Sequence, residues 1–195
     1  MKKILIIISV LLACLCIYKV YTKVTIINLP EGELKWSNIK PESAKLCVPA
    51  AFSSVSNKVV GIYKINGVSY GNDRKYKISI LDNTFVINRS WKSDNGFQQV
   101  ILLKDHKVFN LGNSKKKDIR RALCKDENKT FIIESNYPMT MSKFAQHCSK
   151  HCSNAVYLDM GEYGYGYIKR GIIKCPLFFA GIFTKHKQTN WLYIE

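Results

Sequence analysis

Alternating apolar and polar residues recur through the middle of the chain, and they predict a run of β-strands. Residues 59–65 end at Asn66-Gly67, a dipeptide typical of a tight hairpin turn, and residues 68–70 begin the returning strand. Strands joined by so short a turn pair antiparallel. Further strands are predicted, in chain order, at residues 76–81, 84–88, 99–104, 130–134, 155–158 and 190–194.

The spacing of apolar residues changes to a helical period after Thr140, which can cap the first turn, as can Ser142. No internal repeat or long linker interrupts the chain. This pattern predicts an α+β fold, a single domain with a mostly antiparallel or mixed β-sheet and a few packed helices, preceded by an N-terminal hydrophobic segment. The apolar positions of the predicted helix are Met141, Phe144, Ala145 and Cys148.

The predicted helix continues into H-C-S-K-H-C at residues 147–152. Its two histidines lie one helical turn apart, as do its two cysteines, and such a pair could chelate a soft metal ion. No second half of a zinc site with the usual spacing stands elsewhere in the chain. We therefore expect an amphipathic helix and no metal site, with Phe144 and Cys148 toward the core and His147 and His151 toward the surface.

A hydrophobic segment stands before the predicted domain. Two lysines near the start are followed by fifteen uncharged, mostly apolar residues at positions 4–18, the layout of a signal peptide or a signal anchor. We expect residues 1–23 to direct export, residues 24–44 to form a linker or entry segment and residues 45–195 to form the domain.

Whether the segment is cut decides where the domain is held. No small-x-small cleavage site is evident, and residues 11–14 (L-L-A-C) match a lipoprotein box only in part. An uncleaved anchor is therefore favoured, with the domain attached to the membrane and outside the cytoplasm, which means the periplasm or the cell surface if the source is bacterial. Cleavage would make the protein secreted.

The charge of the chain narrows the class of partner. There are 30 Lys and Arg against 14 Asp and Glu, a formal net charge of +16, so an acidic partner is expected. The basic residues are scattered except around residues 115–121, and no nucleic-acid-binding motif is present. An exported domain of this kind fits phosphate-bearing glycans better than nucleic acid. Composition indicates no particular cofactor and leaves the oligomeric state open.

The stretch Y-L-D-M-G-E-Y-G-Y-G-Y-I-K-R at residues 157–170 is the most unusual part of the sequence. Asp159 stands where the preceding buried strand emerges, which is a common position for a functional carboxylate. Tyr163, Tyr165 and Tyr167 recur at every second residue, so an extended backbone puts the three rings on one face. A solvated turn, with tyrosines packed on a neighbouring layer, accounts for the same residues, and both interpretations stay open at this point.

Several segments stand in a characteristic serial order between residues 45 and 194. They are V-V-G-I-Y-K-I-N-G (59–67), R-R-A-L-C (120–124), P-M-T-M-S-K-F-A (138–145), Y-L-D-M-G-E-Y-G (157–164) and T-N-W-L-Y-I (189–194). In this order and spacing, the chain resembles a divergent member of the phosphodiester glycosidase family, of the N-acetylglucosamine-1-phosphodiester alpha-N-acetylglucosaminidase type. The resemblance implies a domain that acts on sugars linked through a phosphodiester.

The chain departs from the family pattern at two places that shape the sugar-phosphate pocket. Pro49 stands where the family has asparagine, and Ala50 and Ala51 stand where it has a pair of glycines. The glycine-serine tail that follows the family aspartate is M-G-E-Y in this chain, at residues 160–163. The resemblance therefore implies the fold more directly than the activity.

Arg120, Thr140 and Asp159 fall on family positions, so the resemblance implies that they belong to the site. Arg120 is predicted to hold the phosphate through its planar fork of donors, and Arg121 to help it. Asp159 is predicted to act at the sugar carbon. Thr140 is expected to contact the substrate.

Two further features of the tyrosine-rich stretch are assigned from their chemistry. Glu162, three residues after Asp159 and absent from the family pattern, is predicted to supply a second catalytic carboxylate. Tyr163 and Tyr165 are predicted to stack on a pyranose ring.

Two functions from different classes follow from these residues. The first is an exported, membrane-associated hydrolase that cleaves the sugar-phosphate bond of phosphodiester-linked glycans, with Asp159, Glu162 and Arg120 as catalytic residues. The alternative is a catalytically inactive surface domain on the same scaffold that binds glycans or phosphoglycans. The lost asparagine and glycine residues favour the second, and the retained arginine and aspartate favour the first.

Overall fold

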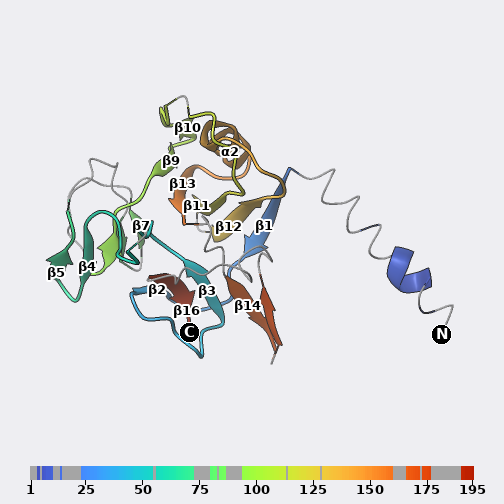
Figure 1. Cartoon of the computed structure of the whole chain (residues 1–195), viewed down its shortest axis with the longest axis horizontal. Helices are drawn as coiled ribbons and strands as arrows, with labels where there is room; N and C mark the ends of the chain where they lie inside the picture. Colours follow the sequence, from blue (N-terminus) through green and yellow to red (C-terminus); the bar gives the residue numbers. More distant parts are fainter. Residues whose placement is uncertain are drawn as a thin grey trace.

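The structure is a computed structural model, drawn in Figure 1 with the chain coloured from its N-terminus to its C-terminus. Among its described residues, no helix is long and apolar enough to cross a membrane. The predicted site residues Glu162, Tyr163 and Tyr165 lie outside the described residues. The structure describes residues 4, 6–10, 14, 23–54, 56–72, 80–82, 84–86, 94–112, 114–127, 129–159, 166–171, 173–176 and 190–195.

A six-stranded sheet forms the centre of the molecule. Every pair of its strands is antiparallel, and β11 and β13 lie in its interior. In spatial order its strands are β1 (Val24–Asn28), β12 (Lys129–Ser135), β11 (Arg121–Asp126), β13 (Asn154–Leu158), β9 (Ile101–Lys104) and β10 (Lys107–Val108).

A five-stranded antiparallel sheet packs against one face of the first sheet. Its strands come from distant parts of the chain. The strand nearest the C-terminus lies between two strands from residues 34–49 and pairs with both. In spatial order its strands are β15 (Ile173–Pro176), β14 (Tyr167–Arg170), β3 (Leu46–Pro49), β16 (Trp191–Ile194) and β2 (Leu34–Ser37).

Two small antiparallel sheets complete the described strands. The predicted hairpin is confirmed: Asn66 and Gly67 join two paired strands with φ angles of 49° and 80°, the left-handed backbone that a type I′ turn requires. The small sheets are β5 (Val68–Tyr70), β4 (Tyr63–Ile65) and β8 (Gly96–Phe97), and β6 (Ile80–Asp82) with β7 (Thr84–Val86).

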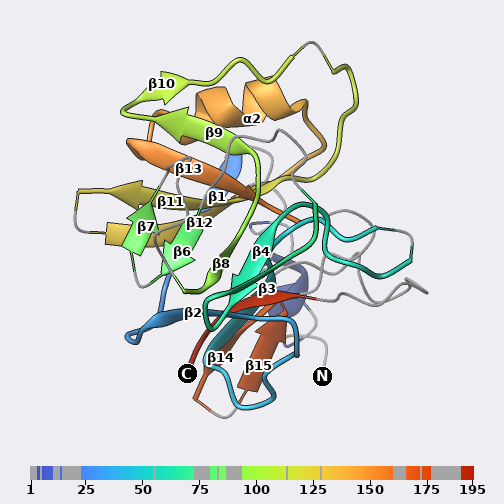
Figure 2. The same ribbon diagram turned by 90° about the vertical axis from the view of Figure 1, so that its left-hand side faces the viewer.

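Helix α2 (Met141–Cys148) covers the other face of the six-stranded sheet, above β13 and β9 in Figure 2. Its predicted orientation is confirmed, because Phe144 and Cys148 are fully buried while His147 is only half-buried and the following His151 is exposed. Among the described residues, no group of three or more His, Cys, Asp or Glu side chains is arranged to hold a metal ion.

The strands of the six-stranded sheet alternate between two cores. On β11, Ala122 and Cys124 join the core beneath α2, whereas Leu123 joins the core between the two sheets. Leu158 at the end of β13 also faces the second sheet, where it meets Val48 and Leu192 of that sheet's strands. The order of layers is therefore helix, six-stranded sheet and five-stranded sheet (Figure 2).

The expected α+β class is wrong, because the structure is mostly antiparallel sheet, and among the described residues α2 is the one helix that packs on it. The physical reason lies in how the second face of the central sheet is covered. The apolar side chains of that face pack on the five-stranded sheet rather than on helices. One amphipathic helix is therefore enough to cover the face that remains. Residues 24–44, expected as a linker, supply β1 and β2 to the two large sheets.

Candidate functional site

Asp159 directly follows the last residue of β13, an interior strand of the six-stranded sheet. Its backbone N–H donates to the carbonyl of Ala50 at 2.9 Å, and its Oδ2 accepts a hydrogen bond from the N–H of Ser53 at 3.2 Å. Because residues 50–53 follow β3 of the other sheet, Asp159 lies where the two sheets meet. The side chain is only 4% exposed.

Asn190 fixes the segment that contacts Asp159, and nothing in the local sequence pointed to it. Its Oδ1 accepts from the N–H of Ala51 at 2.6 Å, and its Nδ2 donates to the Ala51 carbonyl at 3.1 Å and to Ser53 Oγ at 3.3 Å. This amide is fully buried just before β16. These hydrogen bonds connect parts of the chain that are 137–139 positions apart in the sequence. They form only when the tertiary fold brings those parts together.

Arg120 precedes β11 and is held by three oxygen atoms. Its Nε donates to the Met139 carbonyl at 3.2 Å, Nη1 to the Tyr157 hydroxyl at 3.3 Å and Nη2 to the Lys116 carbonyl at 3.0 Å. Asp118 lies 3.5 Å from Nη2 as a further ion-pair partner. The guanidinium is therefore buried and fixed in position.

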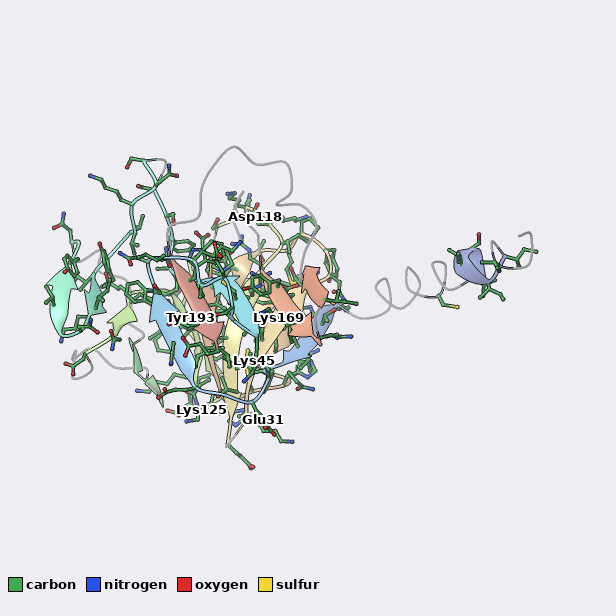
Figure 3. All side chains as sticks on the ribbon, turned by 90° about the horizontal axis from the view of Figure 1, so that it is seen from below. Glu31, Lys45, Asp118, Lys125, Lys169 and Tyr193 are labelled. Atoms are coloured by element: carbon green, nitrogen blue, oxygen red, sulfur yellow. The ribbon has the colours of Figure 1, made fainter. Side chains whose placement is uncertain are left out.

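Arg120 and Asp159 lie on the same face of the sheet. Arg121 pairs with Leu158 across β11 and β13, so the antiparallel register continued by one residue sets Arg120 opposite Asp159. Side chains directly opposite one another share a face and lie close together. The register thus brings these two predicted site residues to one place. Asp118, the ion-pair partner of Arg120, lies well apart from Lys125 of β11 in Figure 3.

Tyr157 links this arginine and aspartate, and the sequence-based prediction missed it. Burial raises the pKa of Tyr157, the Arg120 guanidinium lowers it, and the carboxylates of Asp159 and Asp118 raise it further. Its ring also packs against Phe52, with ring centroids 5.4 Å apart. The signal was present, because Tyr157 stands two residues before Asp159 on a strand and therefore shares its face.

Arg121 points to the opposite face, toward the second sheet, so the two adjacent arginines do not hold one phosphate together. It is fully buried and forms an ion pair with Glu134 of β12. Its Nη1 contacts no hydrogen-bond acceptor among the described residues. Gly166 lies against it, because a Cβ there would stand 3.1 Å from Nη1.

Thr140 acts as the N-cap of α2, where its Oγ1 accepts a hydrogen bond from the N–H of Lys143 at 3.3 Å. It is next to Met139, whose carbonyl binds Arg120, so it borders the cluster. Of the three tyrosines at alternate positions, only Tyr167 is described. Its hydroxyl donates to the Pro41 carbonyl at 3.1 Å, on the outer side of the five-stranded sheet.

The described site thus consists of Asp159, Tyr157 and Arg120, named below the Asp159 cluster. It combines one buried carboxylate, one guanidinium and one phenol. A carboxylate can accept a proton or stabilise positive charge, and a guanidinium can neutralise an anionic leaving group.

Comparison with solved structures supplies the context for this geometry. The zebrafish N-acetylglucosamine-1-phosphodiester alpha-N-acetylglucosaminidase catalytic domain, auto-inhibited by its pro-peptide, is similar to this chain with a TM-score of 0.55. The two chains share a fold. Their sequences are 10% identical, and the match covers 88% of this chain and 81% of that one. No family model matches the chain, and a search of curated proteins finds no match.

Proposed function

We propose that this protein is a hydrolase that cleaves the sugar-phosphate bond of phosphodiester-linked glycans. The observation that carries the proposal is the Asp159 cluster, in which a buried carboxylate and a fixed guanidinium share one face at the end of β11 and β13. The fold shared with a phosphodiester glycosidase supports the choice of substrate class.

The roles follow from the chemistry of the bond. In hydrolysis, water adds to the anomeric carbon of the sugar while the bond from that carbon to the phosphate oxygen breaks. Asp159 takes the proton of the attacking water, and the phosphate monoester leaves with its charge neutralised by Arg120. A phosphate monoester is a good leaving group, so this scheme does not depend on a second carboxylate to protonate it. Glu162, Tyr163 and Tyr165 remain proposed contacts.

The donors of Arg120 are sufficient for this role. A guanidinium has five N–H groups, and the three described hydrogen bonds leave two of them. One is oriented toward Asp118, which already lies in ion-pair range. The other can serve a phosphate oxygen without breaking the contacts that fix the side chain.

A catalytically inactive glycan-binding domain is the second candidate, and one observation favours it. Pro49, which replaces the asparagine of the family pattern, is buried at the end of β3. Ala50 and Ala51, which replace its glycines, are fully buried and pack in the core between the sheets. Their side chains occupy space that glycine would leave to a ligand. Such a domain would bind the glycan without turning it over.

The test measures release of a phosphate monoester from a sugar 1-phosphodiester by the unmodified protein and by Asp159→Asn. We expect turnover to fall at least about 100-fold in the variant, because loss of a general base typically costs that much, while substrate binding persists. Asp126→Asn, at the far end of β11, is the matched control and should leave turnover unchanged. Equal turnover by Asp159→Asn would remove this residue from the mechanism, and no turnover by the unmodified protein would support the binding domain.

We further propose that the protein is exported and that residues 1–23 hold it at the membrane with the domain outside the cytoplasm. The two lysines followed by an apolar run support this location. Protease added to cells stripped of every layer outside the cytoplasmic membrane should digest the domain of the full chain. A chain without residues 1–23 should stay protected inside those cells, and digestion of both chains or of neither would contradict the proposal.

A further inference from the structure

Three of the chain's seven cysteines lie together in the core beneath α2. Cys124 belongs to β11, Cys148 is the last residue of α2, and Cys152 follows it by one helical turn. Their exposed fractions are 0%, 0% and 2%, and all three are free thiols in the structure. The fold therefore brings thiols from two separate parts of the chain into one place that is shielded from water.

Cys124 contacts both of the other thiols. Burial raises the pKa of Cys124, and its hydrogen bonds with the thiols of Cys148 and Cys152 raise that pKa further. The other two cysteines are joined to each other through the backbone, because the N–H and the Sγ of Cys152 both donate to the Cys148 carbonyl, at 3.1 Å and 3.4 Å. Cys124 is thus the common neighbour in this group of three, named below the thiol cluster.

The backbone around the thiol cluster holds its members in place. Cys124 pairs across β11 and β13 with Ala155, which stands three residues after Cys152. Between them, Ser153 Oγ donates to the carbonyl of Lys125 at 3.1 Å, which fixes the segment between α2 and β13 on the residue next to Cys124. Strand pairing and these hydrogen bonds therefore determine where the three thiols meet.

A group of three thiols in contact differs from a single buried cysteine, which is an ordinary small apolar residue of a core. A disulfide bond requires two side chains that point toward each other, with their Cβ atoms about 4 Å apart. Thiols that already share hydrogen bonds have that mutual direction. A bond from Cys124 to either neighbour would close a loop of roughly 25 residues, and disulfides that close loops of this length typically stabilise a fold.

We propose that Cys124 forms an intrachain disulfide bond with Cys148 or Cys152, which fastens β11 to the end of α2. The remaining thiol lies beside the bond and serves as its exchange partner. When its thiolate attacks the Cys124 sulfur, a new bond forms there, and the displaced cysteine leaves as a thiolate that takes up the proton. One disulfide is kept throughout, and Cys124 is its constant member.

Forming the bond requires an oxidant, and a small-molecule disulfide such as oxidised glutathione is the class that fits. Two cysteine thiols lose two electrons and two protons in all, and one glutathione disulfide takes them up to become two glutathione thiols. Because the Cys124 thiol is buried and protonated in the fold, the reaction belongs to the folding chain, before the core closes. The export proposed above takes the chain to oxidising conditions. The bond does not depend on the proposed hydrolase activity.

Refolding of the full chain tests the bond. The protein is reduced and unfolded in denaturant, refolded with reduced and oxidised glutathione, and blocked with N-ethylmaleimide. Trypsin then separates the three cysteines onto peptides 122–125, 144–150 and 151–169. Mass spectrometry should find the first peptide joined to the second or to the third. Recovery of all three as N-ethylmaleimide adducts, or of the first joined to a cysteine outside the thiol cluster, overturns the proposal.

Single substitutions identify the constant member of the bond. Cys124→Ser should remove every disulfide within the thiol cluster, whereas Cys148→Ser and Cys152→Ser should each retain a bond from Cys124 to the other partner. Cys175→Ser, the same change on β15 outside the cluster, is the matched control and should form the bond as the unmodified protein does. Loss of the bond in either partner variant overturns the exchange, and a bond that persists in Cys124→Ser overturns the role of Cys124.

Melting temperatures separate a bond of the native core from one trapped in misfolded chains. The refolded, oxidised protein should melt about 5–10 °C above the same protein kept reduced with dithiothreitol. An equal or lower melting temperature of the oxidised protein overturns the proposal. If Cys124→Ser fails to fold because its hydroxyl is buried in the core, Cys124→Ala serves in its place. This variant should melt at the same temperature with and without the reductant.

Discussion

Replacing Glu134 by glutamine should destabilise the protein strongly, because it leaves the Arg121 charge buried without compensation. Both side chains lie between the sheets, with Arg121 0% and Glu134 6% exposed. Removing one member of a buried ion pair typically costs about 3–5 kcal/mol, far more than the loss of a surface pair. Domains have free energies of unfolding of about 5–15 kcal/mol, so this change removes a large fraction of the total.

Urea denaturation followed by circular dichroism measures the effect. With a slope of about 3 kcal/mol per molar urea, which suits a chain of this size, the midpoint should fall by about 1–2 M. The double change Arg121→Met with Glu134→Leu removes both charges and should restore most of the loss. Lys35→Gln, which breaks the solvent-exposed pair between Lys35 and Glu195, should leave the midpoint unchanged.

A midpoint that falls by less than about 0.3 M in Glu134→Gln would refute the reasoning, because it would mean that water reaches the Arg121 guanidinium. A double variant no more stable than the single one would refute it by another route. In that case the geometry of the side chains, rather than their charge balance, would account for the loss.

Three further changes have expected outcomes. Asn190→Ala should cost about 1–3 kcal/mol in thermal unfolding, because it leaves the buried N–H of Ala51 unpaired; an unchanged melting temperature would contradict this. The unfolded chain ionises Tyr157 near pH 10, whereas the fold holds its pKa higher, so stability should decline as the pH rises above about 10. Tyr157→Phe should reduce that decline, and the same alkaline profile in both proteins would exclude this phenol as its source. Native protein treated with iodoacetamide should be alkylated at the half-buried Cys175 well before Cys124, whose pKa burial raises; mass spectrometry showing the reverse order would contradict the packing.

Local signals in the sequence predicted the local features of this fold. Asn66-Gly67 requires nothing beyond its own backbone preference to form a turn, and helix α2 follows from the spacing of Phe144 and Cys148 alone. Asp159 was placed at the end of a buried strand by the apolar run before it. Each of these predictions depends on residues within one turn or one strand.

Local patterns in the sequence could not predict which distant strands pair with each other. That pairing determines both the fold class and the residues that meet in the site. The pattern of β1 and β2 did not reveal that they join two different sheets, so residues 24–44 were expected to be a linker. Adjacent positions suggested that Arg120 and Arg121 act together, although alternation along a strand sends them to opposite faces. The pairing of Arg121 with Glu134 became visible only once β11 and β12 were aligned.

The place of β16 inside the five-stranded sheet has a consequence for the timing of folding. This strand enters between β2 and β3, whose residues lie roughly 140–160 positions earlier in the chain. A nascent chain therefore cannot complete the sheet, or lock residues 50–53 with Asn190, until the segment 190–194 has left the ribosome. Contacts of such high sequence separation fold slowly. The site therefore cannot assemble before residues 190–194 have been made, and until then residues 50–53 lack the hydrogen bonds of Asn190 that hold them.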